Sequence, residues 1–274
     1  MNLSFSTLGC PNWDLPTIIK RANEYGYAGV DFRGCFNETD LRKSPWFLPS
    51  EIAQTARKIH DAGLVVSGLS SGAKMFDATP EARQASLDEM KAFAELARAT
   101  GAKFVRIFGG SLGGVPQAEA YPVAAQTLCH ASEIAQQAGI LFVVETHDDW
   151  VATPPLVRAF ELAKYPKSVE MLWDIHHPYR CAGESPETTW ANIGAHVRCT
   201  HWKDSVAKPE GGYTLTRFGQ GDLPLKKIFD VMVAGGYNGW HTFEWEKRWH
   251  PNLDEPEVAF PDFIRVMKSF AANP

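Results

Sequence analysis

Four acidic or imidazole side chains stand at the ends of apolar runs in the second half of the sequence. Glu145 ends LFVVE, Asp174 ends EMLWD, His201 follows VRCT, and Glu244 ends HTFE. Leaving such groups unpaired near one another would cost on the order of several kcal/mol each, and a shared cation removes that cost. Three carboxylates and one imidazole favour Mn²⁺, our first choice, or Mg²⁺, Co²⁺ or a catalytic Zn²⁺.

A single strand-end carboxylate or histidine is more often a salt-bridged or hydrogen-bonded structural group. Four of them, each following an apolar run, favour a metal site instead. A structural zinc would prefer thiolates. We therefore expect Glu145, Asp174, His201 and Glu244 to bind one divalent ion.

This ion would stabilise the enediolate that forms when a carboxylate removes a proton next to a carbonyl. Glu145 and Glu244 are the expected catalytic acid/base groups. Return of the proton from the opposite face is epimerisation, and return to the adjacent carbon is isomerisation. Loss of a β-hydroxyl or glycosidic oxygen is lyase chemistry. The residues leave these outcomes open; we expect an isomerase or epimerase of a free sugar or keto-polyol first, and a lyase or dehydratase second.

Other charged residues near strand ends are candidates for handling the substrate. Arg106 could bind a hydroxyl or a carboxylate, and His147 could face inward beside Glu145 or support it from behind. Lys203 could protonate or polarise an oxygen, or it could form a salt bridge with Asp204. Arg33 and Lys74 also follow strands, but their patterns indicate no defined role.

Tryptophan is frequent, at nine residues, and several tryptophans fall near strand ends. Aromatic faces at a barrel mouth suit the C–H faces of a sugar. Trp13 and Trp202 are therefore expected to bind substrate, with core packing as the alternative. The segment from Asp204 to Asp222, rich in glycine and charge, is a candidate lid.

These residues are positioned by an alternation of short β-branched or aromatic runs with longer amphipathic stretches, which repeats along the whole sequence. Strands are expected over 3–8, 29–33, 64–70, 104–108, 140–146, 169–175, 197–203 and 240–245, and helices over 14–25, 49–62, 79–100, 121–137, 154–164, 186–193, 224–234 and 257–270. This alternation predicts an α/β protein with a single (β/α)8 TIM barrel spanning residues 1–274, whose chemistry lies at the C-terminal ends of the strands.

Composition excludes several other classes. The 274 residues carry a formal net charge of −5 without a basic cluster, which argues against nucleic-acid binding. No apolar run is long enough to span a membrane, and the N-terminal segment lacks a signal-peptide pattern. Five scattered cysteines without a CxxC indicate reduced thiols. We expect a cytoplasmic enzyme of carbohydrate metabolism that forms a homo-oligomer, in which a partner subunit could complete the site.

The motifs resemble those of the xylose-isomerase-like sugar isomerase/epimerase superfamily over nearly the whole chain. They are ETH with Glu145, D-x-x-H with Asp174 and His177, H-x-K-D with His201, Gly219-Gln220-Gly221-Asp222, and Glu244 eight residues after Gly236.

The resemblance implies a TIM barrel in which Glu145, Asp174, His201 and Glu244 bind the metal. It also implies that Glu145 and Glu244 act on opposite faces of the substrate and that His177 contacts a substrate oxygen. Ketose 3-epimerases of the superfamily carry an arginine shortly after the histidine of the seventh strand, whereas residues 202–208 here are WKDSVAK. The H-x-K-D form is more similar to the inosose-dehydratase branch.

Overall fold

Successive side chains of a strand face opposite surfaces of the sheet. The core of this protein is therefore divided into one cluster between strands and helices and another inside the barrel. In β5 (Leu141–Glu145), Phe142 and Val144 belong to the large buried cluster between strands and helices. Val143 lies in a separate small cluster with Leu172 and Cys199 of neighbouring strands. Glu145 follows Val143 by two residues and therefore shares its inward-facing surface.

The computed structural model describes residues 1–36 and 38–272, so residues 37, 273 and 274 of the expected 1–274 domain lie outside the described residues. Eight parallel strands close in the order β1-β10-β7-β6-β5-β4-β3-β2, which confirms the predicted (β/α)8 barrel. Besides β5, they are β1 (Asn2–Ser6), β2 (Gly29–Phe32), β3 (Val65–Lys74), β4 (Phe104–Phe108), β6 (Val169–Asp174), β7 (Val197–Trp202) and β10 (Trp240–Phe243).

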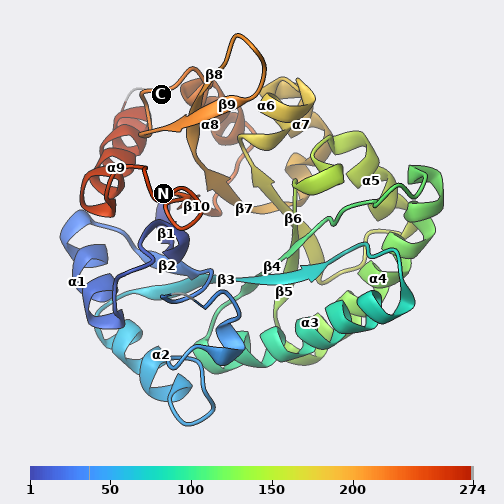
Figure 1. Cartoon of the computed structure of the whole chain (residues 1–274), viewed down its shortest axis with the longest axis horizontal. Coiled ribbons are helices and arrows are strands. Elements are labelled where there is room, and N and C mark those ends of the chain that lie inside the picture. The colour runs from blue at the N-terminus through green and yellow to red at the C-terminus, as the bar shows by residue number, and fades with distance from the viewer. Residues whose placement is uncertain (37, 273–274) are drawn as a thin grey trace.

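Helices surround the barrel, as Figure 1 shows. Polar side chains cap the starts of several of them. Asp14 accepts a hydrogen bond from the Thr17 amide, and Thr79 accepts one from the Ala82 amide. In the described residues, no helix combines the length and apolar character that a membrane span needs. The surrounding helices are α1 (Leu15–Tyr25), α2 (Ile52–Asp61), α3 (Pro80–Thr100), α4 (Gln117–Ala138), α5 (Thr153–Leu162), α7 (Pro186–Ile193), α8 (Leu225–Ala234) and α9 (Pro256–Ala272).

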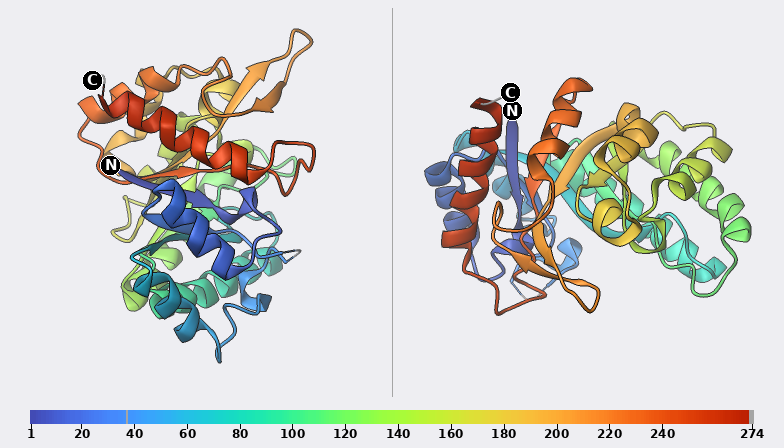
Figure 2. Two further views of the ribbon diagram at one scale, coloured as in Figure 1. Left: turned by 90° about the vertical axis from the view of Figure 1, so that its left-hand side faces the viewer. Right: turned by 90° about the horizontal axis from the view of Figure 1, so that it is seen from above.

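Two features of the barrel mouth were not expected as regular structure. A short helix, α6 (His177–Ala182), begins three residues after Asp174. The segment from Asp204 to Asp222 forms an antiparallel hairpin of β8 (Asp204–Ala207) and β9 (Tyr213–Thr216). This hairpin extends beyond the body of the barrel (Figure 2).

The buried His241 of β10 makes stability depend on pH. Its ring packs among Trp202, Phe229 and Tyr237, and burial lowers its pKa from 6.5 to about 3. Between these values the unfolded chain binds a proton that the folded protein does not, so stability falls as pH decreases below 6.5. From pH 7 to pH 4.5 this group alone should cost about 2–3 kcal/mol.

Urea denaturation of the wild type and of His241→Phe checks this prediction, because all other titrating groups are common to both proteins. The stability of the wild type relative to the variant should decline by that amount as the pH is lowered. Parallel pH dependences of the two proteins would contradict it.

Candidate active site

The strand register brings the four predicted metal ligands together. Asp174 at the end of β6 pairs directly with His201 of β7. Glu145 pairs with Leu172, two residues before Asp174, and His201 pairs with Thr242, two residues before Glu244. A step of two residues keeps a side chain on the same face. All four side chains therefore face the interior at the C-terminal mouth of the barrel.

The resulting cluster is compact and buried. One potential ligand atom from each of Glu145, Asp174, His201 and Glu244 lies within 4.8 Å of all the others. Nδ1 of His201 is 3.1 Å from Oε1 of Glu145 and 3.2 Å from Oε1 of Glu244. The exposed fractions of the four residues lie between 0% and 6%. So dense a carboxylate group requires compensating positive charge.

Two side-chain cations supply part of that charge. Nε of Arg106 lies 3.3 Å from Oε2 of Glu145. Nζ of Lys203 lies 2.9 Å from Oδ2 of Asp174 and 2.6 Å from carboxylate oxygens of both Glu244 and Glu246. Lys203 therefore contacts three carboxylates of the site and does not pair with the adjacent Asp204, which was the alternative drawn from the sequence.

The cations determine the protonation states of the carboxylates. Although burial opposes ionisation, Arg106 and His201 hold the pKa of Glu145 well below its usual range. Lys203 and His201 do the same for the pKa of Glu244 against its burial. Burial raises the pKa of Asp174, although Lys203 opposes this effect. Burial disfavours a charged His201, yet the nearby Glu244 and Glu145 raise its pKa well above the usual value.

The donor set fits a divalent cation. Glu145 Oε2 and Asp174 Oδ2 are buried and accept no hydrogen bond. Arg106 and Lys203 contact them only as ion pairs, so each oxygen keeps lone pairs that an ion could use. The raised pKa of His201 reflects negative charge that faces Nδ1, where an ion could replace the proton. Carboxylates with one imidazole suit Mn²⁺, Mg²⁺, Co²⁺ or catalytic Zn²⁺.

The start of α6 fixes the orientation of Asp174. Its Oδ1 accepts hydrogen bonds from the backbone amides of His176 at 2.9 Å and His177 at 3.2 Å, which leaves Oδ2 directed to Lys203. The His177 ring lies 3.2 Å from the Thr146 carbonyl and 3.4 Å from Asp174, and burial lowers its pKa to about 3. His177 is thus a neutral neighbour of Asp174, and it is not among the residues that line the cavity described below.

The last residue of H-x-K-D anchors the loop that contains the GQGD motif. Asp204 Oδ2 accepts hydrogen bonds from the amides of Gly219 and Gly221 at 2.9 and 2.8 Å. A Cβ atom at position 221 would lie 2.1 Å from the Asp204 carboxylate, so only glycine fits there. These two motifs are therefore parts of one structure, which fixes the chain that follows β7.

A cavity of about 190 Å³ opens onto the carboxylate cluster. It brings together the predicted site residues Glu145, Glu244, Lys203, Arg106 and His147. The His147 ring contacts Phe108 and lies 2.8 Å from the Asp148 carboxylate. The cavity is also lined by residues to which the sequence assigned no site role, namely Leu8, Arg33, Phe108, Glu246 and Trp249. Of these, only Arg33 and Glu246 could have been found from the sequence, because each is a charged residue that follows an apolar strand.

The two tryptophans predicted to bind substrate are not at this cavity. Trp202 is fully buried, and its ring contacts Phe218 and His241 on the outer side of the barrel. Because His201 faces inward, strand alternation turns Trp202 outward. Trp13 packs on Phe260 of α9. Both side chains fill the layer between strands and helices, which corrects the prediction that they face a sugar.

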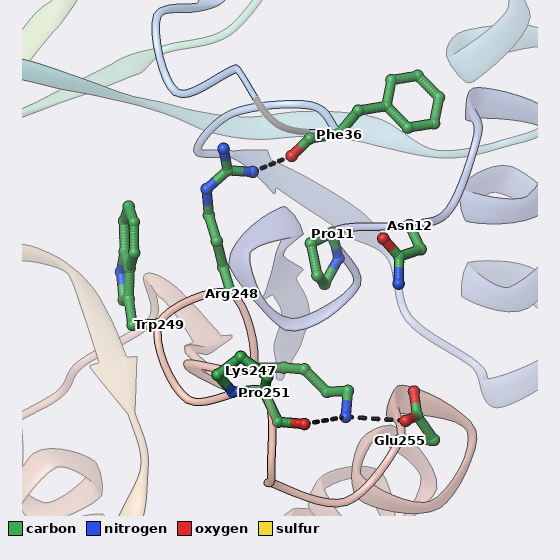
Figure 3. Close-up of a pocket in the computed structure, with 8 residues that line it drawn as sticks. All are labelled: Pro11, Asn12, Phe36, Lys247, Arg248, Trp249, Pro251 and Glu255. Carbon is green, nitrogen blue, oxygen red and sulfur yellow. Dashed lines mark hydrogen bonds and ion pairs between the residues drawn. The ribbon is translucent and has the colours of Figure 1, made fainter.

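A larger cavity of about 470 Å³ adjoins the first, and Trp249 lines both. Figure 3 shows Arg248 extending toward Phe36, whose carbonyl accepts its hydrogen bond. Lys247 points the other way, to the Pro251 carbonyl and the Glu255 carboxylate. The charged groups of this cavity, Lys247, Arg248 and Glu255, are thus engaged within the protein itself.

The xylose isomerase-like TIM barrel family matches the chain over residues 19–270. The chain belongs to this family. A relative by sequence is the uncharacterized protein YihM of Escherichia coli (strain K12), 27% identical over 166 residues. That alignment includes 58% of the chain and spans about half, 47%, of YihM.

Solved structures of this xylose isomerase-like fold cover nearly the whole chain. The probable 3-DHS dehydratase AsbF of Bacillus anthracis has a TM-score of 0.80 at 14% identity, over 98% of this chain and 99% of its own. The IolI protein with a bound zinc atom has a TM-score of 0.80 at 16% identity, over 100% and 97%. D-psicose 3-epimerase of Clostridium cellulolyticum H10 with D-tagatose has a TM-score of 0.77 at 12% identity, over 98% and 99%. At these identities the likeness shows the fold.

The contacts of Lys203 predict a stability that depends on metal. With metal removed by chelator, Lys203→Met should lower the free energy of unfolding by about 3–5 kcal/mol, because buried carboxylates lose their counter-charge. Saturating Mn²⁺ should reduce this loss. In Lys247→Met the loss should be the same with and without Mn²⁺, because that buried ammonium bonds the Pro251 and Leu253 carbonyls and Glu255 instead. Urea denaturation under both conditions provides the comparison; an equal loss for Lys203→Met with and without metal would speak against it.

Proposed function

We propose that this protein is a divalent-metal-dependent isomerase or epimerase that acts on a free sugar or keto-polyol through an enediolate. The observation that carries the proposal is the convergence of Glu145, Asp174, His201 and Glu244 from four successive barrel strands to within 4.8 Å. Mn²⁺ is the expected ion, with Mg²⁺, Co²⁺ or Zn²⁺ as alternatives.

When bound, the ion would act as a Lewis acid toward the carbonyl oxygen of the substrate. The protein's own groups do the rest. Glu145 and Glu244 both line the cavity, and their pKa values lie well below the usual range, so either can remove a proton from carbon as a base. The glutamate that takes the proton can return it to the adjacent carbon in an isomerisation, whereas inversion requires the glutamate on the opposite face to carry a proton. They extend from β5 and β10, which are separated by β6 and β7, so they reach the substrate from different directions.

The remaining groups bind and orient. Arg106 is fixed by a hydrogen bond to the Ser71 carbonyl at 2.9 Å and by stacking on Phe108, 3.7 Å from the ring centre. It keeps Glu145 ionised and can also bind a substrate oxygen. Lys203 holds Glu244 and presents an ammonium that can polarise a substrate oxygen by donating a hydrogen bond. His147 offers a second donor at the cavity wall.

The comparisons support this class of reaction at the level of the family. The neighbours in fold include a ketose epimerase solved with its sugar and a protein that holds zinc. They also include a probable dehydratase, which keeps open the alternative of a metal-dependent lyase that eliminates water or an aglycone from a keto-sugar or keto-glycoside. The cavity of about 190 Å³ is below the range of about 300–1,000 Å³ typical for drug-sized ligands, and it favours a single sugar over a glycoside.

Metal binding gives the first test. The wild type should bind one Mn²⁺ per chain in calorimetric titration. Asp174→Asn and His201→Ala should weaken this affinity by at least about 10–100-fold, because removal of supporting residues alone has that effect in known sites. His130→Ala, which changes an exposed histidine of α4, is the matched control and should bind like the wild type. Equal affinities in all four proteins would refute the assignment.

Proton exchange gives the second test. Mn²⁺-loaded protein incubated in D₂O with a panel of ketoses should exchange the proton next to the carbonyl, as followed by NMR. Glu145→Gln and Glu244→Gln should each slow the exchange by about 10²–10⁴-fold. Glu255→Gln at the neighbouring cavity should leave the rate unchanged.

Mass spectrometry of the products separates the two candidate functions. An isomerase or epimerase conserves the mass of the substrate apart from deuterium. Loss of water or of an aglycone would instead establish the lyase. Exchange that persists undiminished in both glutamine variants would show that other groups move the proton.

A further inference from the structure

Arg33 places a cation on the wall of the catalytic cavity without a carboxylate to neutralise it. Its backbone amide donates to Thr7 Oγ1 at 2.9 Å, and its Nη1 donates to the Thr39 carbonyl at 3.0 Å. Within residues 1–36 and 38–272, no carboxylate oxygen lies within 4.0 Å of its guanidinium. The side chain is held in place, and part of its donor capacity is unused.

The other cations of the cavity differ in this respect. Arg106 pairs with Glu145, and Lys203 pairs with Asp174, Glu244 and Glu246. If the site holds a divalent ion, as the proposed function assumes, that ion and these two cations balance the four carboxylates.

Asp31 is another nearby acid, and it accepts a hydrogen bond from Ser70. Burial raises its pKa, and the charges that act on it come from His201, Arg106 and Glu244 rather than Arg33. Glu244, Glu89 and Glu145 act on Arg33 from beyond ion-pair distance, so among the described residues no carboxylate forms an ion pair with it.

A half-buried guanidinium without an ion-pair partner favours an anionic ligand. Burial lowers the pKa of Arg33 to about 10, so it stays protonated at neutral pH while its charge is poorly screened by solvent. The planar fork of N–H groups matches a carboxylate in shape as well as in charge.

The position of Arg33 indicates which end of the substrate would carry the anion. Arg33 follows β2, and β2 stands opposite β6, the strand of Asp174, in the circle of eight strands. A short substrate whose carbonyl lies at the carboxylate cluster would therefore direct its far end to Arg33.

We propose that the substrate is a sugar acid, namely a ketose with a terminal carboxylate at the end far from the carbonyl, and that Arg33 binds this carboxylate. The proposal rests on the proposed function for the location of the carbonyl and adds the class of substrate. The cavity of about 190 Å³ suits one such chain of carbon atoms.

Matched ligand pairs test it by calorimetry on the Mn²⁺-loaded protein. D-fructose is compared with D-fructuronate, and D-tagatose with D-tagaturonate, because each pair differs only at the terminal carbon. At least one acid should bind about tenfold or more tightly than its neutral partner. Arg33→Gln should abolish this preference, measured as the ratio of the two affinities, while leaving the Mn²⁺ content unchanged, and Arg33→Lys should retain part of it. Arg158→Gln, at an exposed arginine of α5, removes the same charge and should keep the preference.

Several results would overturn the proposal. The first is that the acids bind no better than their neutral partners, or that neither binds. The second is that the preference for the acid survives in Arg33→Gln. The third is that D-fructose 6-phosphate binds more tightly than the acid. The proposed function is judged separately by proton exchange in Glu145→Gln. If an acid binds through Arg33 but undergoes no reaction, the proposed function alone is contradicted. If neutral ketoses are turned over and acids are not preferred, only the role of Arg33 is contradicted.

Discussion

The concentration of negative charge at the mouth of the barrel is the constraint on which the rest of the site depends. Glu145, Asp174 and Glu244 approach one another where little solvent can screen them, and Glu246 adds a fourth carboxylate beside Lys203. Such an arrangement is stable only if cations of fixed position neutralise it. Arg106 and Lys203 do so from inside the barrel, and both are themselves too buried to be held without these carboxylates.

The barrel supplies this arrangement through two simple periodicities. Alternation along each strand sends one set of side chains to the helices and the other to the interior, where Val143, Leu172 and Cys199 fill the space below the carboxylates. Parallel pairing then sets neighbouring strands so that their last inward residues meet. The hydrogen bonds of Asp204 to the glycines of the following loop keep the end of β7, and with it His201, in that register.

Much of this was predictable because it follows from local pattern. The eight strands and the convergence of Glu145, Asp174, His201 and Glu244 can be derived from apolar runs that end in a charge. Residues whose role depends on what lies across the barrel could not be derived in this way. Trp202 was assigned to the mouth because it ends a strand, but one step of alternation turns it outward. From the sequence, Lys203 could equally have paired with its neighbour Asp204. The closed barrel instead places its ammonium beside three carboxylates from other strand ends.

The two bases of the proposed reaction are not equivalent, and the difference lies in their partners. Glu145 is paired with an arginine, which stays charged and cannot release a proton at neutral pH. Glu244 is paired with Lys203. Burial opposes the charge of this ammonium, but Asp174, Glu244 and Glu246 outweigh that effect and raise its pKa well above the usual value, so it also keeps its proton at neutral pH. The two glutamates therefore differ in the shape of the cation beside them, a planar fork at Glu145 and a compact ammonium at Glu244, and not in the supply of a proton. A proton that either carboxylate removes can return to the adjacent carbon, and a carboxylate that carries a proton on the opposite face can invert the centre. The position of the substrate between the two glutamates then decides among isomerisation, inversion and elimination.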